Sequence, residues 1–137
     1  MVGCVIVAHG GLGAELVKVA EVIVGRLDRV EVISVGTDVD VETSRNEISA
    51  AIRRVQDNDG VLIFTDMFGG TPANLSLAFL NEKGVEVITG VNLPMLIKYA
   101  NHRKDKGVTD LALMVREGGV KSIIMASEML GQKTKKQ

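Results

Sequence analysis

The sequence predicts an α/β protein with an open, mostly parallel, doubly wound sheet and helices on both faces. Two observations predict this class. Short runs of β-branched and aliphatic residues alternate with longer amphipathic segments, and Gly or Pro falls between them. The runs at 2–8 and 61–65 also lack a polar face, as is typical of strands that helices cover on both sides. The chain has 137 residues, 46% of them hydrophobic and 24% charged, which suits one globular domain, expected at residues 1–130.

Four strands are expected from the apolar runs. The first run, VGCVIVA, and the third, VLIFT, are apolar almost throughout, and the other two are VEVISV and VEVIT. These runs place the strands at residues 2–8, 30–35, 61–65 and 85–89. Because a helical segment with short connections separates each strand from the next, all four are expected to run parallel.

The segments between the strands carry helical spacing. The first helix is expected to have its apolar side at Leu12, Leu16, Val19, Ile23 and Leu27. The second is expected to have its apolar side at Val41, Ile48, Ile52 and Val55. Asp40 stands just before this second helix and is its expected N-terminal cap.

Proline and glycine mark the remaining elements. Thr71-Pro72 starts a helix, with Thr71 as cap and Pro72 at the first position, and Pro94 opens another. The last helix is expected to begin near Thr109 and to stop at Gly118-Gly119. Residues 120–126 then form a candidate fifth strand, and the tail 131–137 is expected to be disordered.

Charge and cysteine content narrow the function classes. The formal net charge is −1, which argues against nucleic-acid binding, since that requires a basic face. The single cysteine, Cys4, excludes an internal disulfide. The start MVGCVIVAHG lacks the basic region of a signal peptide, and no apolar stretch approaches the ~20 residues of a membrane helix. We therefore expect a cytoplasmic protein that meets the membrane only through a partner.

The carboxyl ends of the strands are where a doubly wound sheet binds its ligands. His9 follows the first strand and Asp66 follows the third, and these two strands are neighbours in the common doubly wound order. The two side chains are therefore expected to meet. A carboxylate that accepts a hydrogen bond from one imidazole nitrogen fixes the tautomer and leaves the other nitrogen as a nucleophile. His9 and Asp66 are thus the candidate catalytic pair for phosphoryl transfer.

Glycine turns that lead into helices flank this pair and are expected to bind phosphate through backbone N–H groups. The candidate phosphate-binding residues are Gly10, Gly11, Gly69, Gly70 and Thr71, the last through its hydroxyl. Each feature alone also fits a structural role, as a strand-end histidine, a turn aspartate or a tight loop; their coincidence at one sheet edge favours a site. Met67 and Met95 fit either a rim that contacts partners or ordinary packing, and His102 fits a solvated helix end. No Cys/His cluster has metal-ligand spacing.

Four strings at these positions resemble the IIA domain of the mannose family of sugar phosphotransferase systems (PTS). They are IVAHG, FTDMFGGTPAN, GVNLPML and REGGVKSI, in that order along nearly the whole chain. The resemblance implies four parallel strands plus an antiparallel edge strand that is exchanged between the subunits of a homodimer. It also implies a phosphohistidine at His9, with Asp66 as its partner aspartate and Thr71 as the hydroxyl residue of the turn.

The resemblance further implies a path for the phosphate. Phosphate arrives from the histidine phosphocarrier protein HPr and passes to a IIB component, and then to sugar that enters through a membrane permease. No metal or organic cofactor is implied. Family members commonly carry an aromatic residue, often Trp, in this turn, and Phe68 stands there in place of Trp.

Two other functions stay open at this point. A regulatory module would use the same phosphorylation of His9 to report energy status without transporting sugar. A response-regulator-like receiver would instead be phosphorylated on Asp66. Receivers need an acidic pair after the first strand to hold magnesium, and Ala8-His9-Gly10 stands there instead, so the receiver ranks lowest.

Overall fold

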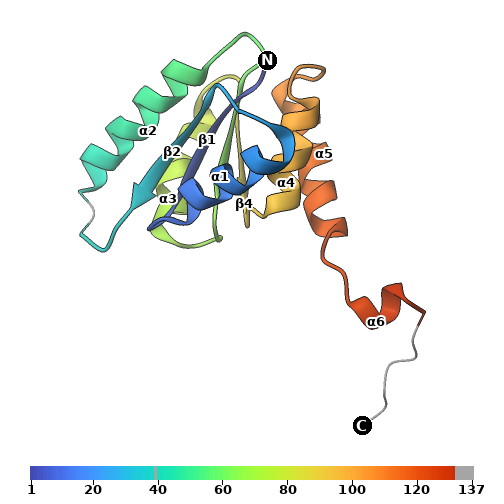
Figure 1. Cartoon of the computed structure of the whole chain (residues 1–137). Coiled ribbons are helices and arrows are strands. Elements are labelled where there is room, and N and C mark those ends of the chain that lie inside the picture. The colour runs from blue at the N-terminus through green and yellow to red at the C-terminus, as the bar shows by residue number, and fades with distance from the viewer. Residues whose placement is uncertain (39, 132–137) are drawn as a thin grey trace.

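A computed structural model describes residues 1–38 and 40–131. Its centre is a single sheet in the order β2-β1-β3-β4, and every neighbouring pair in it is parallel. The strands are β1 (Gly3–His9), β2 (Val30–Val35), β3 (Val61–Thr65) and β4 (Val85–Thr89). The predicted parallel α/β class is therefore confirmed, and β1 and β3 are neighbours as expected (Figure 1).

Helices cover both faces of the sheet. They are α1 (Leu12–Val24), α2 (Val41–Val55), α3 (Thr71–Leu77) with the 3₁₀ turn η1 (Ala78–Asn81), α4 (Leu93–His102), α5 (Val108–Lys121) and α6 (Ala126–Met129). Side chains of α1, α4 and α5 share one hydrophobic core with one face of the sheet, and those of α2, α3 and η1 share a second core with the other face. No helix in the described residues is long and apolar enough to cross a membrane.

The two central strands supply both cores because their side chains alternate between the faces. Cys4, Ile6 and Ala8 of β1 belong to the core under α1, α4 and α5, whereas Val5 and Val7 belong to the core under α2 and α3. Each fully buried aliphatic side chain of this kind contributes about 1.5–3 kcal/mol relative to an exposed one. The strand ends that carry the predicted site are thus held by a rigid centre.

The α1 helix buries a different face from the one its apolar spacing predicts. Its buried residues are Gly13 and Ala20, whereas Leu12, Val19 and Ile23 are 43–55% exposed. A Cβ at Gly13 would lie 2.9 Å from a methyl group of Val32, so α1 approaches the sheet through its small residues. The expected placement of α1's apolar side was therefore wrong in part. In α2, by contrast, Asp40 caps the helix as predicted, its side chain accepting a hydrogen bond from the Glu42 amide at 3.1 Å.

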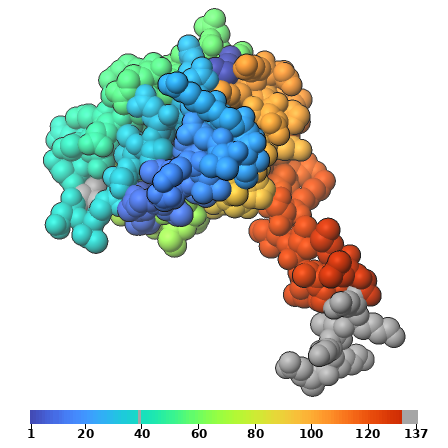
Figure 2. Space-filling view, viewed as in Figure 1, coloured from blue at the N-terminus to red at the C-terminus, as the bar shows by residue number. Residues whose placement is uncertain are grey.

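The C-terminal region differs from the prediction. The α5 helix does not stop at Gly118-Gly119 but continues to Lys121, and residues 122–125 have no regular structure. A Cβ at Gly119 would lie 2.4 Å from Cγ of Met95, so this glycine lets α5 pack closely on α4. Residues 120–126 therefore form no strand within their own subunit. They lead away from the body toward α6, as Figures 1 and 2 show. The expected disorder of 131–137 concerns residues that, apart from 131, lie outside those described.

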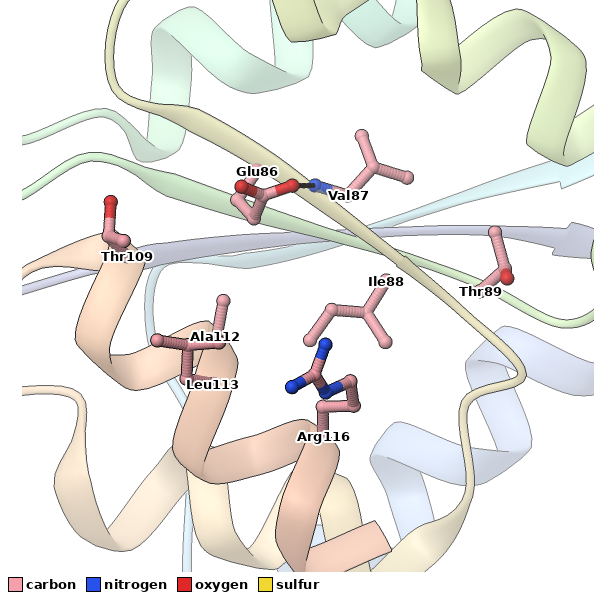
Figure 3. A pocket seen from close by; sticks show the side chains of 8 residues that line it. All are labelled: Glu86, Val87, Ile88, Thr89, Thr109, Ala112, Leu113 and Arg116. Carbon is pink, nitrogen blue, oxygen red and sulfur yellow. Dashed lines mark hydrogen bonds between the residues drawn. The ribbon is translucent and has the colours of Figure 1, made fainter. Parts of the chain in front are cut away.

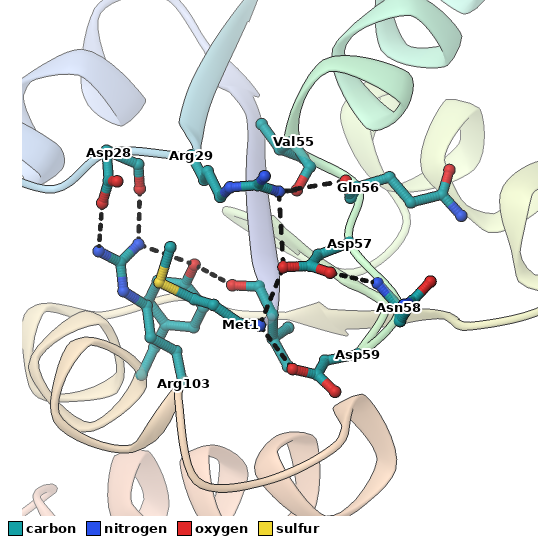
Figure 4. A network of polar contacts seen from close by, with 11 residues as sticks. Met1, Asp28, Arg29, Val55, Gln56, Asp57, Asn58, Asp59 and Arg103 are labelled. Atoms are coloured by element: carbon teal, nitrogen blue, oxygen red, sulfur yellow. Dashed lines mark hydrogen bonds and ion pairs between the residues drawn. The ribbon is translucent and has the colours of Figure 1, made fainter.

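A network of ion pairs and hydrogen bonds ties the amino ends of the strands together (Figure 4). The buried Arg103 donates to the Asp28 carboxylate at 2.8 Å, and the Tyr99 hydroxyl donates to the Val2 carbonyl at 2.7 Å. The Met1 amino group pairs with the carboxylates of Asp57 and Asp59. This network lies at the amino ends of the strands, and His9 lies at the opposite, carboxyl end of β1.

Candidate functional site

His9 and Asp66 meet at the carboxyl edge of the sheet. His9 is the last residue of β1, and Asp66 directly follows β3, whose Thr65 is in register with Val7. The Oδ2 atom of Asp66 lies 2.7 Å from Nδ1 of the His9 ring and also accepts the His9 backbone N–H at 2.9 Å. Oδ1 of Asp66 accepts the Met67 amide at 3.0 Å. The aspartate is therefore fixed by three donors, and it fixes the ring in turn.

The two side chains differ in exposure, and this sets their chemistry. The Asp66 side chain is 10% exposed and that of His9 is 49% exposed. Burial alone would raise the pKa of Asp66, but hydrogen bonds from the His9 amide and ring hold this pKa below its usual value, and the charge of the ring lowers it further whenever the ring is protonated. Because an ionised carboxylate only accepts hydrogen bonds, Nδ1 of His9 carries the proton. The Nε2 atom is left with a lone pair that can act as a nucleophile.

The turn after β3 lies against the His9 ring. A Cβ at Gly70 would be 3.0 Å from Cε1 and 3.6 Å from Nε2 of His9, so only glycine leaves the ring its full space. Gly70 is the N-terminal cap of α3 and Thr71 is its first residue, so the helix begins one residue earlier than the sequence predicts. Gly69 has φ +88°, a left-handed conformation that glycine adopts without strain. Gly70 therefore lies against the His9 ring, with Gly69 and Thr71 on either side of it in the chain.

The turn after β1 is held by β2. Gly10 has φ +54°, and its amide donates to the Val35 carbonyl at 3.1 Å. The Ser34 hydroxyl donates to the Gly10 carbonyl at 2.7 Å. Sequence reasoning missed Ser34; its position at the end of the second predicted strand was the signal that could have found it. Gly11, which follows, is the N-terminal cap of α1.

A pocket of about 590 Å³ opens beside His9. Its lining consists of His9, Gly10, Val35, Gly36, Thr37, Val41 and Thr71. Of the predicted phosphate-binding residues the lining thus includes Gly10 and Thr71. The loop between β2 and α2 supplies Gly36 and Thr37, and the first residue of α2 supplies Val41. The sequence analysis did not connect this loop with the site.

The flanking residues take different places. Met67 and Phe68, in the turn after Asp66, are 55% and 75% exposed, as a partner-contacting rim requires. Met95 is only 4% exposed and packs beneath Gly119, so the packing alternative holds for it. His102 ends α4, and its Nδ1 lies 4.0 Å from a carboxylate oxygen of Asp105, in agreement with a helix-end role.

The geometry disfavours a receiver with Asp66 as phosphoacceptor. Both carboxylate oxygens of Asp66 already accept hydrogen bonds, and its side chain is nearly buried. Among residues 1–38 and 40–131, no group of three or more His, Cys, Asp and Glu side chains is placed to hold a metal ion. The His9 side chain, by contrast, is 49% exposed.

Comparison with known proteins finds relatives among phosphotransferase-system components. The family model EIIA-man, described as PTS system fructose IIA component, matches residues 3–116. The PTS system mannose-specific EIIAB component of Escherichia coli K12 is 33% identical over 127 residues, covering 89% of this chain and 39% of that protein. The chain thus spans about two fifths of that relative's length. The PTS system fructose-specific EIIA component of Bacillus subtilis is 26% identical, with 95% of this chain and 90% of that protein covered.

Solved structures show the same similarity. The crystal structure of the phosphotransferase system component EIIA from Streptococcus agalactiae superposes with a TM-score of 0.84 at 27% identity, covering 93% of this chain and 99% of that one. The mannose/sorbose-specific IIA subunit from Enterococcus faecalis superposes with a TM-score of 0.80 at 22% identity, a likeness of fold. With the family model matching more than half of its residues, the chain belongs to the EIIA-man family of phosphotransferase-system IIA components.

Proposed function

We propose that this chain carries a phosphoryl group on His9, accepting it from phosphorylated HPr and passing it to a IIB component for sugar uptake. The observation that carries the proposal is the 2.7 Å contact between Nδ1 of His9 and Asp66, because it directs reaction to the exposed Nε2. The lone pair of Nε2 attacks phosphorus while the donor nitrogen departs with its bonding electron pair. The ring then carries a positive charge, which the Asp66 carboxylate stabilises.

The surrounding turns supply groups for the phosphoryl oxygens. We infer that the predicted phosphate-binding residues act through N–H donors at the starts of α1 and α3 and through the Thr71 hydroxyl; they are Gly10, Gly11, Gly69, Gly70 and Thr71. The contact of Gly70 with the His9 ring supports this placement. In this proposal the residues 1–130 form one IIA domain that works in the cytoplasm and meets the membrane only through a permease complex.

The names of the relatives bear on the choice between transport and regulation. They describe PTS components for mannose, fructose and sorbose. Three sugars among the relatives leave the sugar of this chain open, whereas the shared system favours transport over a purely regulatory module. The EIIAB designation of the Escherichia coli relative supports IIB as the acceptor.

We also propose that the chain works as a homodimer that exchanges residues around 119–126. The strand β4 is an edge of the sheet, and a groove of about 340 Å³ runs beside it toward α5, lined among others by Ile88, Leu113 and Arg116 (Figure 3). The residues after α5 expose apolar side chains, with Ile123 79% and Ile124 54% exposed. A second subunit's segment, paired antiparallel with β4, would satisfy the backbone of both edges. This exchange requires the last turn of α5 to open.

The phosphoryl carrier is tested by phosphorylating the protein with phosphoenolpyruvate, enzyme I and HPr. We expect one phosphate per chain, labile in acid and stable in base, as a phosphohistidine is. His9→Ala should keep its fold, because the ring lies at a strand end outside both cores, and should take up no phosphate. Normal labelling of His9→Ala, or a base-labile product, would contradict the assignment. Transfer of the label to a purified IIB component tests the second step.

A further inference from the structure

The hydroxyl of Thr65 is buried at the carboxyl end of β3, directly before Asp66. The Thr65 side chain is 0% exposed, and within residues 1–38 and 40–131 its Oγ1 is the one buried side-chain oxygen or nitrogen atom without a hydrogen-bond partner. A buried hydroxyl without a partner costs free energy, whereas valine has nearly the same shape and carries no such cost. Packing alone therefore does not account for a threonine at this position.

The side chain of Thr65 lies on the face of the sheet that α3 covers. Side chains alternate along a strand, and Val61 and Ile63 of β3 belong to the core under α2 and α3. Because α3 begins soon after β3 ends, its first turn lies at the same edge of the sheet as Thr65. The Thr65 carbonyl accepts the amides of Gly90 and Val91, each at 3.0 Å, which fixes the backbone here. The hydroxyl is thus held at the base of the turn that connects β3 to α3.

A phosphoryl group on His9 would change what this turn must bind. A Cβ at Gly70 would lie 3.6 Å from Nε2, so oxygens of a phosphoryl group on that nitrogen come close to the turn. The N–H and C=O groups of a trans peptide point in opposite directions. An N–H that turns outward to a phosphoryl oxygen therefore directs its C=O inward, where it needs a buried donor. The peptide between Gly69 and Gly70 turns with least strain, because glycine accepts positive and negative φ alike.

We propose that Thr65 is a positioning residue whose hydroxyl gains its hydrogen-bond partner only when His9 carries phosphate. The inference rests on the proposed function and extends it to how the phosphorylated turn is held. In the phosphorylated protein the Gly70 amide donates to a phosphoryl oxygen, and the Thr65 hydroxyl donates to the Gly69 carbonyl that the same rotation turns inward. The unpaired hydroxyl raises the free energy of the unphosphorylated state, and its pairing lowers that of the phosphorylated state. Both effects favour phosphate on His9.

The quantity to measure is the equilibrium constant for phosphoryl transfer from phosphorylated HPr to the intact chain, taken from the distribution of labelled phosphate after mixing. Thr65→Val removes the hydroxyl and keeps the shape. We expect it to lower this constant at least about tenfold, a change of about 1.4 kcal/mol, while its unphosphorylated form resists urea as well as the wild type does. Thr65→Ser keeps the hydroxyl but loses a buried methyl group. It should unfold more easily and keep an equilibrium constant within a few-fold of wild type.

Ser76→Ala is the matched control. The Ser76 hydroxyl is also fully buried, but it already donates to the Pro72 carbonyl at 2.7 Å, so its loss should leave the equilibrium constant unchanged. An equilibrium constant of Thr65→Val equal to that of the wild type, or an equal fall in Thr65→Ser, would overturn the role of the hydroxyl. Lower stability of unphosphorylated Thr65→Val would also overturn it, because the hydroxyl would then already have a partner. A wild-type chain that takes no phosphate from phosphorylated HPr would instead overturn the proposed function.

Discussion

One carboxylate oxygen of Asp66 holds both the backbone and the side chain of His9. Oδ2 accepts the His9 amide at 2.9 Å and lies 2.7 Å from Nδ1 of the ring. The ring therefore cannot turn about its χ angles without losing a hydrogen bond that the backbone helps to position. This double contact explains how a residue at a strand end, half exposed to solvent, keeps a single orientation for reaction.

Replacing Asp66 by Asn should separate orientation from charge. The amide can still accept a hydrogen bond through its oxygen, but it cannot neutralise the positive ring. We expect Asp66→Asn to fold and to accept phosphate from HPr more slowly by about 10²- to 10⁴-fold. Stopped-flow or quench measurements of labelled phosphate give the rate, with circular dichroism as the folding control. A rate equal to that of the wild type would reduce Asp66 to a turn residue.

The same aspartate should make stability depend on pH. Hydrogen bonds from His9 outweigh burial and lower the pKa of Asp66 in the folded state, so its contribution is present above the unfolded pKa of about 3.9. That contribution is lost as pH falls through the lower folded pKa. We therefore expect the difference in unfolding free energy between wild type and Asp66→Asn to shrink below about pH 4. Urea unfolding of both proteins between neutral and acidic pH measures it, and a constant difference would contradict the hydrogen-bonded carboxylate.

Gly70 and Gly11 form a matched pair of glycines at the site. An added Cβ at Gly70 would press on the His9 ring at 3.0 Å, whereas at Gly11 it would meet no heavy atom within 4 Å. Neither residue has a positive φ, so alanine strains neither backbone. We expect Gly70→Ala to slow phosphoryl transfer by on the order of 10- to 100-fold through displacement of the ring. Gly11→Ala should stay within a few-fold of wild type; similar rates for both variants would show that the ring has room to move.

The two adjacent glycines of α5 should respond in opposite ways to alanine. At Gly119 the new methyl would overlap Met95, with 2.4 Å to Cγ, and force α5 away from α4 at a cost of about 1–3 kcal/mol. At Gly118 it would meet the flexible Lys98 at 3.5 Å, an ordinary contact, and gain up to about 1 kcal/mol of helix propensity. Denaturant unfolding of the two variants checks the contrast. Equal effects would mean that the close approach of Gly119 to Met95 is relaxed in solution.

The proposed dimer is tested by sedimentation equilibrium at micromolar concentration. We expect the wild type to be dimeric, because exchange would bury Ile123 and Ile124 against a second subunit. The double variant Ile123→Asp/Ile124→Asp should shift toward monomer. Val22→Asp is the control, since Val22 is 82% exposed on α1 and remote from the exchanged segment in sequence. A monomeric wild type would refute the exchange.

The local sequence pattern was sufficient to predict three strands and the meeting of His9 with Asp66. The predicted ranges 30–35, 61–65 and 85–89 match β2, β3 and β4, because short apolar runs between turn residues have few other solutions. The meeting of His9 with Asp66 followed from strand order alone. The features that the sequence did not predict depend on contacts between residues that are distant in sequence.

The end of α5 and the packing of α1 illustrate this limit. Gly118-Gly119 is a stop signal by propensity, yet α5 continues through both glycines to Lys121, with Gly119 packed closely against Met95. The apolar residues of α1 predict its buried side by size, but the close approach of Gly13 to Val32 rotates that side. Gly36 and Thr37 line the pocket beside His9 because β2, which precedes them, pairs with β1. No sequence motif marks this loop as part of the site.

The ion pairs of Arg103 and Met1 lie at the amino ends of the strands, opposite to His9 and Asp66 (Figure 4). The ion pairs that stabilise the fold and the residues proposed to react therefore lie at opposite ends of the same strands. A designer who wished to alter which partner this chain serves could vary the exposed Met67 and Phe68 in the turn after β3 and still expect most variants to fold. Conversely, loss of the Arg103–Asp28 pair should lower protein yield in cells without changing which partner is chosen.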